Sequence, residues 1–179
     1  MSASKLNTLL ENINDSIAGT LTYPKTKFYQ QAELQEKNEQ TFPLVNNGSL
    51  KGYKISPDSA IALQSYHRVL GSVTETDYEK GKGRYPYQER VYTIRNIWIG
   101  NLSKMPDRPY ESNDDVKNDV VNSFPVNLNS KELIRITNEN INKQEILDEE
   151  FAGVKTKSLI LELIVFYIEY EIRQRIKCN

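Results

Sequence analysis

The apolar residues near the start of the chain recur at helical spacing. Leu6, Leu9, Leu10, Ile13 and Ile17 fall at i, i+3, i+4, i+7 and i+11, which places them in one stripe on a helix. The spacing predicts a helix over residues 4–18, capped at its start by a serine and ended by a glycine. Such a stripe cannot stand alone in water, so we expect it to pack on a sheet or on another helix.

The stretch from residue 28 to residue 101 contains most of the expected strands. Residues 28–34 and 41–45 are short and β-like, a charged segment lies between them, and "NNGS" at 46–49 is a turn signal. The run from 60 to 76 alternates and predicts a long, half-buried strand. Its inward side carries Ile61, Leu63, His67, Val69 and Val73.

A second strand is expected at "RVYTIRNIWIGNL", residues 90–102, and it has apolar residues on both faces. Tyr92, Ile94 and Trp98 share one face, and Val91, Ile97 and Ile99 share the other. This pattern predicts a central strand that is covered on both sides.

A short second helix is expected after two prolines near residue 107. Ser112 and Asp115 have the spacing of a capping box, and Pro125 stops the helix. Its buried stripe would be Val116, Val120, Val121 and Phe124. The following segment, residues 131–149, is interpreted as a strand that runs into an acidic loop.

The closing stretch, "SLILELIVFYIEYEIRQRIKCN" at 158–179, is the most apolar part of the chain. A membrane anchor is excluded by length, because a spanning helix needs about 20 apolar residues. Isoleucines at every fourth position are compatible with a helix, but strict alternation from Phe166 to Arg173 favours a strand. Residues 159–165 are apolar on both sides and should lie between a helix layer and a second packed surface. Where one face then emerges, towards solvent or a neighbouring subunit, it carries Glu169, Glu171, Arg173 and Arg175.

These elements predict an α+β fold with a mostly antiparallel sheet. The N-terminal helix and the second short helix pack on the sheet, and a long hairpin loop joins the two central strands. A chain of 179 residues suits a single domain, residues 1–179. Long loops or insertions are expected near 35–60, 79–88 and 102–112.

The composition of the chain excludes few functions and does not point to any particular one. The net charge of -1 gives no global field that would attract nucleic acid or anionic lipid. The N-terminus lacks the pattern of a secretory signal, so we expect an intracellular product. The single cysteine, Cys178, cannot form an internal disulfide, and a catalytic thiol at this position is not expected.

No residue cluster predicts catalysis, so we expect no enzymatic activity and no catalytic, cofactor-binding or metal-binding residues. The Gly-Lys-Gly at 81–83 lacks the rest of a phosphate loop and is interpreted as a flexible loop tip. His67 is expected to be a hydrogen-bonded core residue rather than a general base. The loop at 79–88 is the expected interaction loop, with side chains suited to a partner chain or a nucleic-acid backbone: Lys80, Lys82, Arg84, Tyr85 and Tyr87.

The order of elements resembles that of the tail-terminator and neck (head-tail connector) proteins of tailed bacteriophages. The matching segments are "KLNTLLENINDSI", "RVYTIRNIWIGN", "SNDDVKNDVVNSF" and "IRITNENINKQEILDE" followed by "LILELIVFYIEYEI". The likeness covers most of the chain but is one of pattern and order, without an invariant motif. The chain departs from the compact family pattern between residues 35 and 60 and before the second helix.

The resemblance implies a structural subunit of a virion ring around the channel between capsid and tail, made in the host cytoplasm and located in the virion. Copies would join their sheets edge to edge, and loops would face neighbouring rings. The implied partners are other copies of the chain, neighbouring connector, portal or tail proteins, and DNA that passes through the channel without sequence-specific contacts. No membrane partner is implied. Two other classes remain open: another virion or adaptor protein, such as a capsid-decoration or baseplate subunit, and a small metal-dependent hydrolase or nuclease that uses His67, Asp114 or Asp115.

Overall fold

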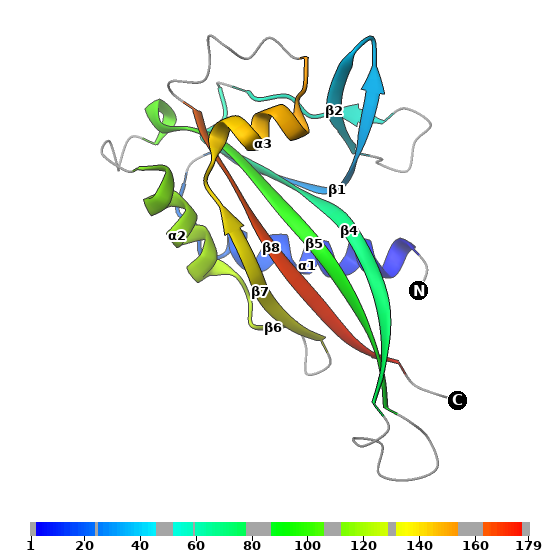
Figure 1. Ribbon diagram of the computed structural model, residues 1–179. Helices are drawn as coiled ribbons and strands as arrows, with labels where there is room; N and C mark the ends of the chain where they lie inside the picture. Colours follow the sequence, from blue (N-terminus) through cyan, green and yellow to red (C-terminus); the bar gives the residue numbers. More distant parts are fainter. Residues whose placement is uncertain are drawn as a thin grey trace.

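One eight-stranded sheet organises the chain, and helices pack on both of its faces (Figure 1). The computed structural model describes residues 3–23, 25–45, 52–58, 60–77, 87–105, 112–128, 132–153 and 163–176. The helices are α1 (Ala3–Ala18), α2 (Asn113–Ser123), α3 (Lys143–Glu150) and the 3-10 turn η1 (Leu102–Lys104). The strands are β1 (Thr26–Lys37), β2 (Gln40–Val45), β3 (Tyr53–Lys54), β4 (Leu63–Asp77), β5 (Tyr87–Asn101), β6 (Asn127–Leu128), β7 (Glu132–Asn140) and β8 (Leu163–Ile176). The predicted α+β class is therefore confirmed.

The strand order is β3-β2-β1-β4-β5-β8-β7-β6. The sheet is mixed, which corrects the expectation of a mostly antiparallel sheet, because β1 runs parallel to β4. The two strands are not joined by a tight turn; the chain passes through β2 and β3 before it returns to β4, and such a crossover permits parallel pairing. The antiparallel block β4-β5-β8-β7 forms the long central part.

Helix α1 covers one face of this block, as its apolar stripe predicts. All five stripe residues, Leu6, Leu9, Leu10, Ile13 and Ile17, are buried. Beneath it, the Trp98 ring stacks on Phe166 at 6.1 Å, and Phe28 meets Trp98 edge-on at 5.7 Å. We call this helix-covered side of the sheet the α1 face.

Helix α2 packs on the same face and begins as predicted. Ser112 is the N-cap, and its side chain and that of Asp115 form the reciprocal capping box. Val116 and Val120 are buried, and the Tyr23 hydroxyl donates a hydrogen bond of 2.8 Å to Asp119. The second half of α2 is thereby linked to the segment that follows α1.

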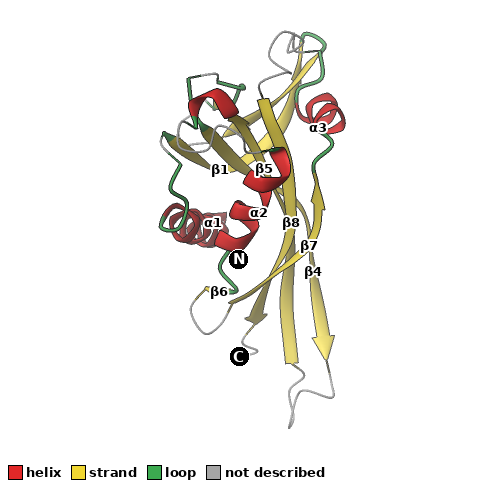
Figure 2. Cartoon of the chain, turned by 90° about the vertical axis from the view of Figure 1, so that its left-hand side faces the viewer, coloured by secondary structure: helices red, strands yellow, loops and turns green. Residues whose placement is uncertain are grey.

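Helix α3 corrects the expectation of an acidic loop after residue 140. It lies on the opposite face of the sheet from α1 and α2 (Figure 2), with Ile146, Leu147 and the following Phe151 buried against Val165 and Ile97. Its apolar positions are too few to form a stripe that periodicity would detect. Asn142 caps it by accepting a hydrogen bond from the Glu145 backbone N–H.

The region 35–60, expected as a long loop or insertion, instead contains the end of β1 and all of β2 and β3. Strands β1 and β2 form a hairpin whose two turn residues, Asn38 and Glu39, have φ of 53° and 60°. Positive φ at both central positions is the geometry that suits the twist of a two-residue hairpin. The turn signal at 46–49 lies outside the described residues.

The closing stretch is the strand β8, as its alternation predicts, and it lies between β5 and β7. Leu163 and Val165 are buried on the α3 side, and Ile164 and Phe166 are buried on the α1 face. Residues 159–162, for which two covered faces were also predicted, lie outside the described residues. Across the described segments, no helix combines the length and apolar character that a membrane span requires.

Candidate functional site: an interaction surface on the sheet

Helix α3 covers only one end of its side of the sheet, and the other end carries no helix among the described residues (Figure 2). We call this uncovered part the open face. It is built from alternate residues of four strands: Gly71, Val73 and Glu75 of β4; Glu89, Val91 and Thr93 of β5; Glu171, Arg173 and Arg175 of β8; and Leu133 and Arg135 of β7. A two-sided sheet with one end uncovered leaves room for a partner.

The four residues predicted where β8 emerges all point to this side of the sheet. Glu169 lies at the border with α3, and Glu171, Arg173 and Arg175 follow on the open face at every second position. Because β8 is an internal strand, any contact they make with a neighbouring molecule involves the face of the sheet rather than its edge.

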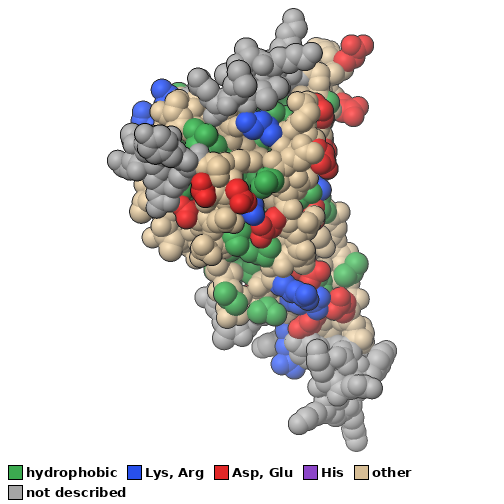
Figure 3. Space-filling model, turned by 60° about the vertical axis from the view of Figure 1, so that its left-hand side comes forward, with side chains coloured by type: hydrophobic (Ala, Val, Ile, Leu, Met, Phe, Trp, Pro, Cys, Tyr) green, Lys and Arg blue, Asp and Glu red, His purple; other side chains and the backbone are tan. Residues whose placement is uncertain are grey.

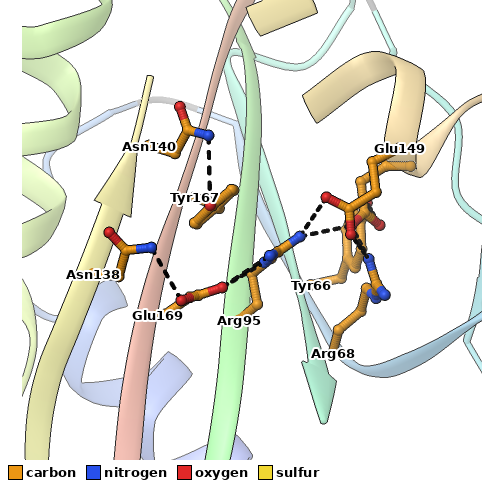
Figure 4. Close-up of polar contacts among 9 residues, drawn as sticks. Tyr66, Arg68, Arg95, Asn138, Asn140, Glu149, Tyr167 and Glu169 are labelled. Carbon is orange, nitrogen blue, oxygen red and sulfur yellow. Dashed lines mark hydrogen bonds and ion pairs between the residues drawn. The ribbon is translucent and has the colours of Figure 1, made fainter. Parts of the chain in front are cut away.

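Arg95 is the centre of a polar network where α3 meets the open face (Figure 4). Its Nη1 lies 2.6 Å from Glu149 Oε2, and its Nη2 lies 2.9 Å from Glu169 Oε1. Asn138 donates to the other Glu169 oxygen at 3.2 Å. The Arg95 guanidinium also lies 4.1 Å above the centre of the Tyr167 ring, and Asn140 donates to the Tyr167 hydroxyl at 3.4 Å.

A second arginine, Arg68, binds the two glutamates that end α3. It contacts Glu149 at 3.0 Å and the fully buried Glu150, which also accepts a hydrogen bond of 2.9 Å from the Tyr66 hydroxyl. Burial raises the pKa of Glu150, although Arg68 opposes this shift. Burial also tends to raise the pKa of Glu149, but hydrogen bonds from Arg95 and Arg68 lower it overall.

These contacts explain why α3 can end in two carboxylates. Negative charge at a helix C-terminus is opposed by the helix dipole, and the last turn of α3 contains no basic residue. Arg68 and Arg95, from β4 and β5, supply the missing positive charge. The network therefore holds α3 on the sheet and leaves little unbalanced charge for a ligand.

Arg173 organises the charges further along the open face. Its guanidinium lies 2.9 Å from Glu75, 3.0 Å from Glu171 and 3.8 Å from Glu89. Two further arginines, Arg135 and Arg175, occupy neighbouring positions on β7 and β8. Acidic and basic groups thus alternate over a surface that has almost no net charge.

Exposed apolar side chains accompany these charges. Val73 is 60% exposed and Leu133 is 47% exposed, and the β4-β5-β8-β7 registers place them in one row with Arg173 between them. A view of the β7 side shows mixed acidic and basic side chains in the lower half with small, separate hydrophobic patches (Figure 3). Mixed arginine-rich and apolar surfaces are typical of protein contacts that form and separate in water.

Both long edges of the antiparallel block are partly open. Strand β1 pairs with β4 only as far as His67, so the outer edge of residues 68–77 has no strand partner among the described residues. Strand β6 pairs with β7 only at Glu132 and Leu133, with one further bond from Ile134 N–H to the Val126 carbonyl. The outer edge of residues 135–140 likewise has no strand partner in the described part of the chain. Unpaired strand edges are templates for pairing with another chain.

The predicted interaction loop cannot be placed on this surface. Lys80, Lys82, Arg84 and Tyr85 lie outside the described residues, and Tyr87 is the first residue of β5, opposite Asp77 of β4. Strands β4 and β5 do form the predicted hairpin around this segment.

His67 is a hydrogen-bonded core residue, as predicted. It is fully buried; its Nε2 lies 2.8 Å from Asn14 Oδ1, and its Nδ1 lies 3.0 Å from the Tyr170 hydroxyl. Asn14 Nδ2 donates to the Tyr29 carbonyl, which turns its Oδ1 towards the ring and makes Nε2 the protonated nitrogen. Desolvation lowers the His67 pKa to about 3.

The other residues of the enzyme alternative are elsewhere. Asp114 and Asp115 lie in the first turn of α2, where Asp115 is part of the capping box and Asp114 pairs with Lys117 at 3.1 Å. The described residues contain no cluster of three or more His, Cys, Asp or Glu that could hold a metal ion. The structure thus does not bring these candidate catalytic groups together.

Apart from Glu169, the residues of the Arg95 network were not predicted, because Arg68 and Arg95 lie 54 to 82 positions from their carboxylate partners in the sequence. One signal was available: Arg68 is the single Asp, Glu, Lys or Arg in residues 60–74, and Arg95 is the single one in residues 91–103. A comparison of the chain with protein-family models and with curated proteins finds no match. The function must therefore be inferred from the sequence and the geometry.

Proposed function

We propose that the protein is a structural subunit of a bacteriophage virion ring, in the neck or at the tail terminus, and that it acts by self-assembly rather than by catalysis. The observation that carries this proposal is the pair of open edges on opposite sides of one sheet. The two edges differ in sequence and in the strands that flank them, so each can complement the other in a neighbouring copy. Contacts between two different surfaces are the kind that build rings.

The charge of the molecule supports self-association. The chain has a net charge of -1, and the open face balances Arg173 against Glu75, Glu89 and Glu171 within one copy. Identical subunits therefore meet without strong mutual repulsion. The exposed Leu70 and Val73 of the β4 edge supply apolar area that a neighbouring strand would cover.

In this proposal the segment 79–88 contacts an adjacent ring or lines the channel, and the residues from Glu169 to Arg175 contribute to a contact with a neighbouring molecule. The neighbours are other copies, together with connector, portal or tail proteins of the same particle. DNA in the channel would be contacted through its backbone only, because no base-reading element is evident in the sequence.

Immunogold electron microscopy tests the location. Antibody raised against the purified chain should label the junction of head and tail in particles of the virus that encodes it, and particles made without the gene should accumulate as unjoined heads and tails. Labelling over the capsid surface or the baseplate would instead favour another virion role. Normal, infectious particles that lack the protein would contradict a structural function.

A further inference from the structure

The two open edges lie diagonally across the sheet. The strand registers place Gly71, Thr93, Glu171 and Arg135 in one row, so Gly71 of β4 and Arg135 of β7 stand at the same level. From that level the open part of β7, residues 135–140, runs towards the α3 end of the sheet. Most of the open part of β4, residues 68–77, runs towards the opposite end.

The directions of the two strands are also complementary. Successive strands of the β4-β5-β8-β7 block are antiparallel, so β4 and β7 point in opposite directions. Neighbouring copies in a ring are related by a rotation that keeps corresponding strands nearly aligned. A β7 edge therefore meets the β4 edge of the next copy in antiparallel orientation, the arrangement of the stronger ladder.

The geometry points to a defined seam between copies, in which residues 135–140 of β7, bulged between Ile136 and Asn138, pair with residues 71–75 of the next copy's β4, and Arg135 stands opposite Glu75. This inference rests on the proposed ring and specifies how its subunits join. Only a displaced register of this kind brings the open part of one edge against the open part of the other, because β1 blocks β4 before Arg68 and the segment around β6 blocks β7 before Arg135.

Side-chain orientation agrees with this register. Arg135 and Glu75 both point to the open face, where opposite charges on facing residues stabilise a strand pair. The next pair, Ile136 and Thr74, both point to the α1 face. The seam also covers Val73, which is 60% exposed in the single copy.

The displacement sets the shape of the ring. Arg135 stands level with Gly71 within one copy but opposite Glu75 in the next, a shift of four residues for every four strands. The shift is therefore one residue for each strand. An eight-stranded barrel of shear eight has the same shift per strand, and its strands tilt by about 36° from the barrel axis. That value lies within the usual range for closed barrels, about 35–45°.

The sign of the displacement also decides which face is outside. Strands of closed barrels coil right-handedly, following the twist of the individual strands. In Figure 1, which views the sheet from the α3 side, the next copy lies beyond β7 and is displaced towards the α3 end, so the strands lean to the left of the ring axis. Right-handed strands lean to the left when a ring is seen from inside. The open face is therefore turned inwards, and α1 and α2, on the opposite face, lie on the outer surface. Glu171, Arg173 and Arg175 then line the channel, where the neighbouring molecule that they contact is one inside the channel, and the strand edges form the seam between copies.

Cysteine cross-linking tests the seam directly. In a Cys178→Ser background, a chain with both Glu75→Cys and Arg135→Cys should form a ladder of covalent oligomers under oxidation or with a short bismaleimide. The two sites of one copy are three strand spacings apart across the sheet, about 14 Å, and four residues apart along it. They are too far apart for an internal disulfide, whose Cα atoms lie about 4.4–6.8 Å apart. Every cross-link must therefore join two copies.

Gly71→Cys with Arg135→Cys is the matched control, because Gly71 is exposed on the same face and the same edge as Glu75 but four residues, about 13 Å, from it. We expect at least tenfold less cross-linking for this pair. Equal cross-linking of both pairs would overturn the register. Efficient dimers from Glu75→Cys alone would overturn the β7–β4 seam, because they require two β4 edges to meet.

Native mass measurement of the chain without cross-linking distinguishes failure of the proposed seam from failure of the proposed ring. Closed oligomers without Glu75–Arg135 cross-links would refute the seam but not the ring, whereas a chain that stays monomeric would contradict both.

Charge reversal gives a second test of the seam. Glu75→Arg and Arg135→Glu should each weaken assembly, and the double variant should restore it. Failure of the double variant to recover any assembly would count against this pair.

A separate labelling experiment tests which face of the sheet lines the channel. In closed oligomers a bulky maleimide should label Asp15→Cys, on the exposed side of α1, and should label Arg175→Cys, which is exposed on the open face of the single copy, at least tenfold more slowly. In the dissociated chain the two sites should react at similar rates. Preferential protection of Asp15→Cys would place α1 inside and overturn the orientation.

Discussion

His67 makes the stability of the fold depend on pH in a predictable direction. The ring is fully buried between α1 and the sheet, and desolvation lowers its pKa from 6.5 to about 3. In the unfolded chain the ring takes up a proton below about pH 6.5, whereas in the folded protein it stays neutral until about pH 3. The contribution of His67 to the free energy of unfolding is therefore fully present above pH 6.5, and it is lost progressively as the pH decreases towards 3.

The size of the effect follows from the gap between the pH and the unfolded pKa. At about pH 5 the gap is roughly 1.5 units, and each unit corresponds to about 1.36 kcal/mol. The His67 contribution should thus reduce the free energy of unfolding by about 2 kcal/mol between pH 8 and pH 5. Carboxylates such as Glu150, whose pKa is raised, act in the opposite direction as the pH falls and must be subtracted.

The assay is urea unfolding followed by the fluorescence of Trp98, the single tryptophan and a fully buried one. His67→Gln has no titrating ring, so the difference in pH dependence between the wild type and this variant isolates the His67 effect whatever its absolute stability. A wild-type loss about 2 kcal/mol greater than that of the variant is expected. Parallel curves for the two proteins would refute the assigned burial and hydrogen bonding of His67.

Three further variants test other parts of the structure. Ser112→Ala removes the α2 N-cap and should lower the free energy of unfolding by about 1 kcal/mol, and an unchanged value in urea unfolding would argue against the capping box. Arg95→Met removes the contacts to Glu149 and Glu169 and should destabilise by about 1–2 kcal/mol, with faster amide exchange in α3 than in α1; equal exchange would contradict the role of Arg95 in holding α3. Deletion of residues 80–86 should leave the melting temperature within about 2 °C of wild type but impair particle assembly in an infection assay, and normal assembly would exclude the proposed role of this loop.

The parts of the fold that the sequence predicted correctly are those whose stabilising interactions are local or periodic. The α1 stripe, the Ser112 capping box and the alternation of β8 each depend on residues within a few positions of one another. Such patterns follow directly from helix and strand geometry. They are therefore visible in a single sequence.

The parts that were missed depend on distant partners. Helix α3 is stabilised by burial of Ile146 and Leu147 and by charges from Arg68 and Arg95, none of which its own eight residues reveal. The parallel pairing of β1 with β4 is decided by a crossover rather than by either strand's pattern. Asn142 followed three residues later by Glu145 was a usable helix-start signal in the segment interpreted as a loop.

The residues of the candidate surface also fall into a predicted group and a missed group. Alternation correctly placed Glu169, Glu171, Arg173 and Arg175 on one side of a strand. Their partners Arg95, Glu75 and Glu89 and the two open edges became visible only with the strand registers, because these combine segments far apart in the chain.

The central claim is that identical copies assemble through two different edges into a closed ring. Negative-stain electron microscopy of the purified chain, over a range of concentrations up to crowded solutions, tests it most directly. The account predicts rings of uniform size with a central channel and cyclic symmetry. Particles that remain monomers, or stop at two-fold dimers, at every concentration would contradict it.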